Sequence, residues 1–175
     1  MYEVEAKVAL TPSDFKRLKE TVSKIGKFTG ESLKKDTYYG DTKIIHMRTR
    51  DEEGGVVFCL KNKTLIDGVE ANTEMEWEIA NKKKWEKILS KSGIRPSVKK
   101  VKKTEAYDYK GFHIELNHIR TLGYFLEIEK IVNKKENIPK AKQELIDLFK
   151  QLGYSQKDFE KKYYLELLAE KNRNS

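Results

Sequence analysis

Charged residues at every second position are the feature of this chain that could do chemistry. Near the N-terminus Glu3, Glu5 and Lys7 alternate with apolar residues, and in a β-strand all three side chains would share one face. A surface strand of an antiparallel sheet shows the same alternation, so this segment alone does not indicate a site. The pattern returns later in the chain, and there most faces carry a single sign of charge.

Several later segments carry such faces. Their basic side chains are His46, Arg48, Arg50, Lys61, Lys100 and Lys102. Their acidic side chains are Glu74, Glu76, Glu78, Glu115, Glu127 and Glu129. The segment around Lys102 is ambiguous, because Lys99 and Lys103 lie on its opposite face.

Faces of one sign need counter-ions. Two carboxylates about 4 Å apart repel by about 4 kcal/mol at an effective dielectric constant near 20. A hard cation among the glutamates relieves this repulsion, and ligands that are all oxygen suit magnesium or manganese. A phosphate chain does the same among arginines and lysines. Both kinds of face in one cavity would therefore bind a metal-bound polyphosphate.

The segments with these faces are expected to form one antiparallel sheet. Eight strands are predicted, over residues 2–8, 28–39, 43–50, 56–61, 70–79, 98–109, 112–119 and 124–132. Helices are predicted after Thr11-Pro12, after the possible cap Asn81, near Pro139 and after the capping box Ser155–Asp158. Eight strands can close into a barrel, whose outside would cover the apolar helix faces. The predicted fold is α+β: a closed eight-stranded antiparallel β-barrel with flanking helices, in one domain over residues 1–175.

Composition narrows the classes of function. The net charge is +8 and 37% of residues are charged, which fits either a solvated lysine-rich face or a polyanionic ligand. Cys59 is the only cysteine, which excludes an intrachain disulfide and a cysteine-based zinc cluster. It lies in an apolar run, where a small buried thiol is expected. The sequence shows neither a signal peptide nor an apolar segment long enough to span a membrane, which predicts a soluble cytoplasmic protein with no membrane partner.

Taken in order, these residues resemble the CYTH superfamily, the triphosphate tunnel metalloenzymes. Glu3 to Lys7 reads as the signature ExExK, Arg48 and Arg50 as the paired arginines, and Lys61 as the lysine of the next strand. Glu74-Met75-Glu76 resembles the later acidic strand, and the stretch 121–129 resembles G-L-G-x-F-x-E-x-E. Residues 162–168 are similar to the C-terminal helix of the family. The resemblance implies a closed eight-stranded tunnel.

The resemblance also implies roles for residues. The expected ligands of Mg²⁺ or Mn²⁺ are Glu3, Glu5, Glu76, Glu127 and Glu129, with Glu74 as a further candidate. The expected triphosphate ligands are Lys7, Arg48, Arg50, Lys61 and Lys102. The catalytic residues implied are Lys7, Lys102 and Glu5.

Three positions depart from the family pattern. Relatives often have a basic residue where Thr104 stands, and Lys103 could substitute only if the strand bulges. Relatives often have an aspartate at Asn117, which Glu115 on the same face could replace. The first glycine of G-L-G is Thr121.

The function expected from the resemblance is that of a class IV adenylate cyclase, which converts ATP to cyclic AMP and pyrophosphate. The resemblance to this branch also implies a homodimer. The alternative is an inorganic tripolyphosphatase or thiamine triphosphatase, in which water attacks the terminal phosphorus. A third hypothesis is a non-catalytic polyanion-binding module, but its acidic faces would repel RNA or polyphosphate, and no nucleic-acid partner is expected. His46, His113 and His118 are expected to have structural or surface roles, since their spacing fits no metal motif.

Overall fold

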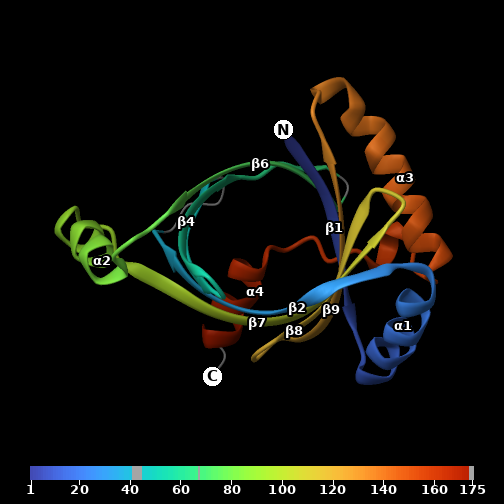
Figure 1. The fold of residues 1–175 in the computed structure, drawn as a ribbon, viewed down its shortest axis with the longest axis horizontal. Coiled ribbons are helices and arrows are strands. Elements are labelled where there is room, and N and C mark those ends of the chain that lie inside the picture. Colours follow the sequence, from blue (N-terminus) through green and yellow to red (C-terminus); the bar gives the residue numbers. More distant parts are fainter. Residues whose placement is uncertain (41–44, 67, 174–175) are drawn as a thin grey trace.

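Eight strands close into a ring in this structure, a computed structural model that describes residues 1–40, 45–66 and 68–173 (Figure 1). The strands of the ring are β1 (Tyr2–Leu10), β2 (Lys27–Tyr39), β3 (Ile45–Glu52), β4 (Gly55–Asn62), β6 (Val69–Glu78), β7 (Pro96–Tyr109), β8 (Phe112–Ile119) and β9 (Gly123–Val132). A two-residue strand that the sequence did not predict, β5 (Leu65–Ile66), pairs only with β6. The first two residues of the strand predicted over 43–50 lie outside the described residues.

All pairings in the ring are antiparallel. The order is β1-β9-β8-β7-β2-β3-β4-β6, and β6 closes the ring by pairing with β1. β1 therefore lies between two strands that are distant in sequence: Glu5 faces Glu129 of β9 on one side and Glu70 of β6 on the other. The predicted eight-stranded closed barrel is confirmed.

The helices are α1 (Pro12–Ile25), α2 (Lys82–Lys91), α3 (Ile138–Gln151) and α4 (Tyr164–Arg173), with 3₁₀ turns η1 (Lys135–Asn137) and η2 (Gln156–Asp158). The first three lie outside the ring, whereas α4 contributes Tyr164 and Leu165 to the wall of the space inside it (Figure 1). α1 and α3 lie together beside β1 and β9, whereas α2 lies at the far end of the ring (Figure 1). Within the described residues, no helix has both the length and the apolarity needed to cross a membrane.

Local signals set the first two helices. The side chain of Thr11 accepts a hydrogen bond from the backbone nitrogen of Asp14, and Pro12 begins α1, as predicted. Asn81 caps α2 in the same way by accepting from the backbone nitrogen of Lys84. Both caps satisfy N–H groups that a helix N-terminus leaves without partners.

The largest apolar cluster lies outside the barrel. Val4, Ala6 and Val8 of β1 point outward and pack in one cluster with residues of α1 and α3, among them Val22 and Phe149. Alternation along the strand then turns the intervening side chains of β1 into the ring. The inward-facing ionic side chains of the ring therefore share one interior space.

The C-terminal helix begins later than predicted. The capping box of Ser155 and Asp158 is present, but it closes only the 3₁₀ turn η2, and α4 starts at Tyr164. Phe159 is buried in the core and its backbone bridges to Val8, while the Glu160 nitrogen donates to the carbonyl oxygen of Lys7. These tertiary contacts hold the chain extended along β1, and they override the local helix signal.

Candidate functional site

The interior of the barrel is a polar cavity of about 470 Å³, which is within the size range of small-molecule sites. Nine of the ten residues assigned to metal or triphosphate binding from the sequence are in its wall. They are Glu3, Glu5, Arg48, Arg50, Lys61, Glu76, Lys102, Glu127 and Glu129. The exception is Lys7.

Three carboxylates form a cluster on one side of the cavity. Glu3, Glu5 and Glu129 each offer an oxygen within 4.8 Å of the other two. Burial, followed by the charges of Glu5 and Glu3, raises the pKa of Glu129 to about 8. Burial is also the main cause that raises the pKa of Glu3. Like charges held this close, with oxygen donors only, fit a hard divalent cation such as Mg²⁺ or Mn²⁺.

Glu76 lies in a different group, with Cys59 and Glu74. Burial raises the pKa of the Cys59 thiol to about 12, so the sulfur stays protonated and donates to Glu74. Burial acts to raise the pKa of Glu74, but Arg48 and then Lys61 outweigh it and hold that pKa at about 2. Glu74 is paired with two protein cations and Cys59 offers a protonated thiol, so this group fits a hard metal less well than the first cluster, whose ligands are all carboxylates.

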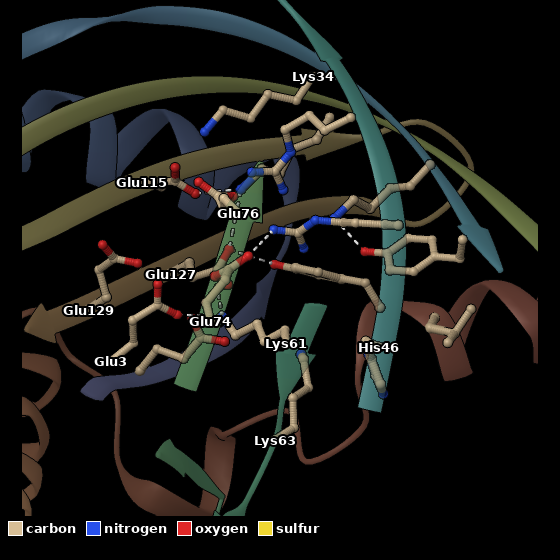
Figure 2. A pocket seen from close by; sticks show the side chains of 18 of the residues that line it. Glu3, Lys34, His46, Lys61, Lys63, Glu74, Glu76, Glu115, Glu127 and Glu129 are labelled. Atoms are coloured by element: carbon tan, nitrogen blue, oxygen red, sulfur yellow. Dashed lines mark hydrogen bonds and ion pairs between the residues drawn. The ribbon is translucent and has the colours of Figure 1, made fainter. Parts of the chain in front are cut away.

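Glu127 lies in a third group, around Lys102. The ammonium of Lys102 is 2.5 Å from Glu115 and 3.6 Å from Glu127. Burial opposes the charge of Glu115, but Lys102 outweighs it and lowers the pKa of Glu115. The predicted metal ligands are thus divided among three groups, and Figure 2 shows Glu3, Glu127 and Glu129 on the side of the cavity opposite His46.

The cations of the cavity are held by carboxylates. Lys61 reaches Glu3 at 2.7 Å and Glu5 at 3.1 Å, which raise its pKa well above the usual value against the effect of burial. Arg48 pairs with Glu74 at 2.7 Å, yet its buried Nε has no hydrogen-bond partner among the described residues. A buried donor without a partner is costly, and an anion in the cavity would satisfy it.

Lys7 lies outside the cavity wall. Its ammonium is 2.8 Å from Glu70, and both side chains are almost completely buried. The rings of Tyr163 and Tyr164 lie over it, with centroids 5.7 and 5.3 Å away. Lys7 points into the ring, as the alternation predicted, but its ion pair with Glu70 of β6 and the two tyrosine rings keep it out of the open space.

β2 contributes charged residues to the site that were not predicted from the sequence. Asp36 is fully enclosed and pairs with Arg50 at 2.8 Å and with Lys100 at 2.9 Å. Burial would raise the pKa of Asp36, but Lys100, Arg48 and Arg50 lower it well below its usual value. Lys34 lies on the same inward face, two residues away. Charged residues alternate along 28–39 in the sequence, but only the pairing of β2 with β7 shows which of them face the cavity.

Two of the departures from the family pattern turn out to be neighbours. Thr104 and Asn117 face each other on β7 and β8, and the threonine hydroxyl donates to the asparagine oxygen at 2.6 Å. The amide of Asn117 donates to Glu127 at 2.9 Å and to Glu115 at 3.1 Å. Lys103 cannot replace a basic residue here, because it points outward and pairs with Glu31.

The remaining departure, Thr121, has φ +79°, a conformation that favours the glycine of the family pattern.

Of the histidines, His118 stacks on Tyr124 as expected of a surface residue. His46 and His113, in contrast, are in the cavity wall, and His113 Nδ1 is 2.9 Å from Asp108.

Known proteins are similar to this chain in sequence and in fold. The sequence matches the CYTH domain over residues 1–164. A Methanocaldococcus jannaschii protein, provisionally named an adenylate cyclase, is 28% identical over 176 residues, covering 95% of this chain and 98% of that protein. A Pyrococcus horikoshii structure superposes with a TM-score of 0.83 at 25% identity, covering 95% of this chain and 99% of that one.

A further solved structure with the same fold comes from Hippeastrum. This protein is provisionally named an adenylyl cyclase, and a dominant triphosphatase activity is described for it. It superposes with a TM-score of 0.71 at 20% identity, covering 96% of this chain and 95% of that one.

Proposed function

The chain belongs to the CYTH domain family, whose members act on triphosphates, and on this premise we propose that it is a class IV adenylate cyclase that converts ATP to cyclic AMP and pyrophosphate. The observation that carries the proposal is one cavity whose wall contains both the carboxylates Glu3, Glu5 and Glu129 and a set of buried cations. The M. jannaschii relative, which matches almost the whole chain, supports the choice of reaction.

In this proposal the metal site is the carboxylate cluster. Glu3, Glu5 and Glu129 would hold Mg²⁺ or Mn²⁺, with Glu76 and Glu127 as further ligands. When bound, the ion would lower the pKa of the attacking hydroxyl and offset charge on the phosphates. The like charges of the cluster, which otherwise repel one another, are the reason to expect this ion here.

The cations would bind the triphosphate. Arg48, Arg50, Lys61 and Lys102 would donate to non-bridging phosphate oxygens and hold the α-phosphorus in line with the ribose 3′-hydroxyl. Lys7 would join them only if its ammonium moved from Glu70. Because the cations are already fixed by ion pairs, little reorganisation is needed when charge develops in the transition state.

The reaction forms one bond and breaks one. The 3′-oxygen bonds to the α-phosphorus, the bond from that phosphorus to the α,β-bridging oxygen breaks, and pyrophosphate leaves. The hydroxyl proton passes to water. Lys102 and the arginines would stabilise the negative charge that gathers on the leaving pyrophosphate.

A second candidate is hydrolysis of the terminal phosphate of tripolyphosphate or thiamine triphosphate. The specific observation in its favour is the Hippeastrum neighbour with its dominant triphosphatase activity. The same cavity would serve both reactions, and only the nucleophile would change.

Product analysis tests the proposal. Purified protein is incubated with ATP, and separately with tripolyphosphate, in the presence of Mg²⁺ or Mn²⁺, and Glu5→Ala is the control. Cyclic AMP and pyrophosphate are expected from ATP with the unchanged protein, and neither is expected from the variant. Orthophosphate as the sole product would instead establish the hydrolytic reaction. Tripolyphosphate binding that is unaffected by metal, with no turnover, would contradict both.

A further inference from the structure

Lys34 is the cavity lysine whose charge is least balanced. Lys61, Lys100 and Lys102 each have a carboxylate oxygen within 3.1 Å of the ammonium. For Lys34, by contrast, no carboxylate of the described residues is near enough to form an ion pair. A cation turned into a cavity without such a partner has to be balanced by solvent or by a ligand.

The strand pairing places Lys34 against other cations. It faces Lys102 directly in the register of β2 and β7, so both side chains leave the sheet on the same inner face. Burial, followed by the charge of Lys102, lowers the pKa of Lys34, and Arg50 adds to this effect. Glu115 acts in the opposite direction, and Figure 2 shows Lys34 reaching across the edge of the cavity toward that carboxylate. Lys102 and Arg50 already pair with carboxylates here, so Lys34 is the one of these three cations without an ion-pair partner among the described residues.

We propose that Lys34 is a phosphate-binding residue, which together with Lys102 and Arg50 holds one phosphoryl group of the substrate at this end of the cavity. The inference rests on the proposed function, because it names a further ligand of the same triphosphate. A phosphoryl group offers several acceptor oxygens and more than one negative charge. It can therefore accept from three cations that repel one another in its absence.

Stability distinguishes this role from a structural one. A lysine that supports the fold has a partner, and its neutralisation destabilises the protein. Lys34 instead faces like charge, so its neutralisation should leave the ligand-free protein unchanged in melting temperature or raise it slightly. The affinity for tripolyphosphate, in contrast, should fall when Lys34 is neutralised.

The test compares Lys34→Gln and Lys34→Arg with the control Lys35→Gln, which removes an equal charge from the exposed outer face of the same strand. Binding of inorganic tripolyphosphate is measured by calorimetry with Mg²⁺ present, together with the melting temperature without ligand. We expect Lys34→Gln to weaken binding about 10-fold, as for the loss of one charge-assisted hydrogen bond. Lys34→Arg should restore binding to within about 3-fold, and Lys35→Gln should bind as the unchanged protein does.

Three outcomes would overturn the inference. If Lys34→Gln binds tripolyphosphate as tightly as Lys35→Gln does, Lys34 is not a ligand, although the proposed function stands. If Lys34→Gln loses melting temperature together with affinity and Lys34→Arg does not restore them, the role is structural. If the unchanged protein itself fails to bind tripolyphosphate, the proposed function fails and this inference fails with it.

Discussion

At the residue scale, the raised pKa of Glu129 links the stability of the protein to pH, because this carboxylate is buried beside Glu3 and Glu5. Its pKa in the folded protein is about 8, whereas an exposed glutamate titrates near 4.5. Between these values the folded state holds a proton that the unfolded state releases. The stabilisation is complete below pH 4.5, and it is lost as the pH rises through 8.

This leads to a prediction for Glu129→Gln, which cannot titrate. With a chelator present, the free energy of unfolding of the unchanged protein should fall by about 2 to 4 kcal/mol more than that of the variant between pH 5 and pH 8.5. Chemical denaturation at the two pH values measures the difference. Mg²⁺ at pH 8.5 should stabilise the unchanged protein more than the variant. Equal pH dependence of the two proteins would show that Glu129 is not held among like charges.

Arg50 supports a second residue-scale prediction, because its carboxylate partner has another cation. Asp36 remains paired with Lys100 when Arg50 is removed, so Arg50→Ala should cost about 1 to 2 kcal/mol of stability, less than when a buried charge loses its only partner. ATP affinity should fall about 10-fold or more, as measured by calorimetry with Mg²⁺. Arg120→Ala, at an exposed position after β8, is the control and should bind normally. Unchanged affinity in Arg50→Ala would remove this residue from the site.

At the scale of elements, β7 and β8 contain a coupled pair of departures from the family pattern. The family pattern that the resemblance implies has a basic residue and an aspartate at these positions, where this chain has Thr104 and Asn117 joined by a hydrogen bond. The two departures remove one charge of each sign, so together they leave the net charge of the tunnel unchanged. From the sequence, each position taken alone predicts the loss of one functional charge.

The coupling can be measured with a double-mutant cycle. Asn117→Asp alone adds a carboxylate beside Glu115 and Glu127 and should cost about 2 to 4 kcal/mol. Thr104→Lys alone adds a buried cation and should also destabilise. The double variant should be less destabilised than the sum of the two, by about 1 to 3 kcal/mol, as measured by denaturant unfolding. Additive effects on the free energy of unfolding would mean that the two side chains do not interact.

Elements with strong local signals could be predicted from the sequence, and those shaped by distant contacts could not. The hairpin of β7 and β8 closes at Lys110-Gly111 as predicted, with positive φ at both residues. α4 could not be placed, because Phe159 is bound to the core next to β1 and not by its neighbours in sequence. The partner of Lys7, Glu70, was missed for the same reason: the β1–β6 pairing that joins them connects residues more than 60 positions apart.

At the scale of the whole molecule, the barrel reverses the usual placement of charge. Ionic side chains line its interior, and the largest apolar cluster lies between the outer face and helices α1 and α3. Figure 1 shows these two helices together beside β1 and β9. The sequence indicated the inner surface because side chains of one sign alternate with large apolar residues. It did not show which acids meet which bases, since that depends on strand order and register. The homodimer implied by the resemblance stays a prediction.

Closure of the ring predicts that the molecule unfolds as one unit. β1 pairs with both β6 and β9, and Val4, which is fully buried, lies opposite Ala71 on one side and Lys130 on the other. Without β1 neither remaining edge has a partner, so no part of the ring is expected to stay folded alone. Calorimetry and circular dichroism should therefore report a single, coincident transition. Val4→Ala should shift the whole transition by about 1 to 3 kcal/mol without splitting it.

Ligands of the cavity should stabilise the same unit. Mg²⁺ with tripolyphosphate at about 100 times the dissociation constant should raise the free energy of unfolding by about 2.7 kcal/mol. Glu5→Ala should lose the part of this effect that depends on Mg²⁺, because one member of the carboxylate cluster is gone. Two separate transitions, of which only one responds to the ligand, would show that the tunnel and the helix-covered core are not one cooperative domain. A single transition that shifts with the ligand would mean that the charges inside the barrel and the apolar core outside it stabilise the same folded state.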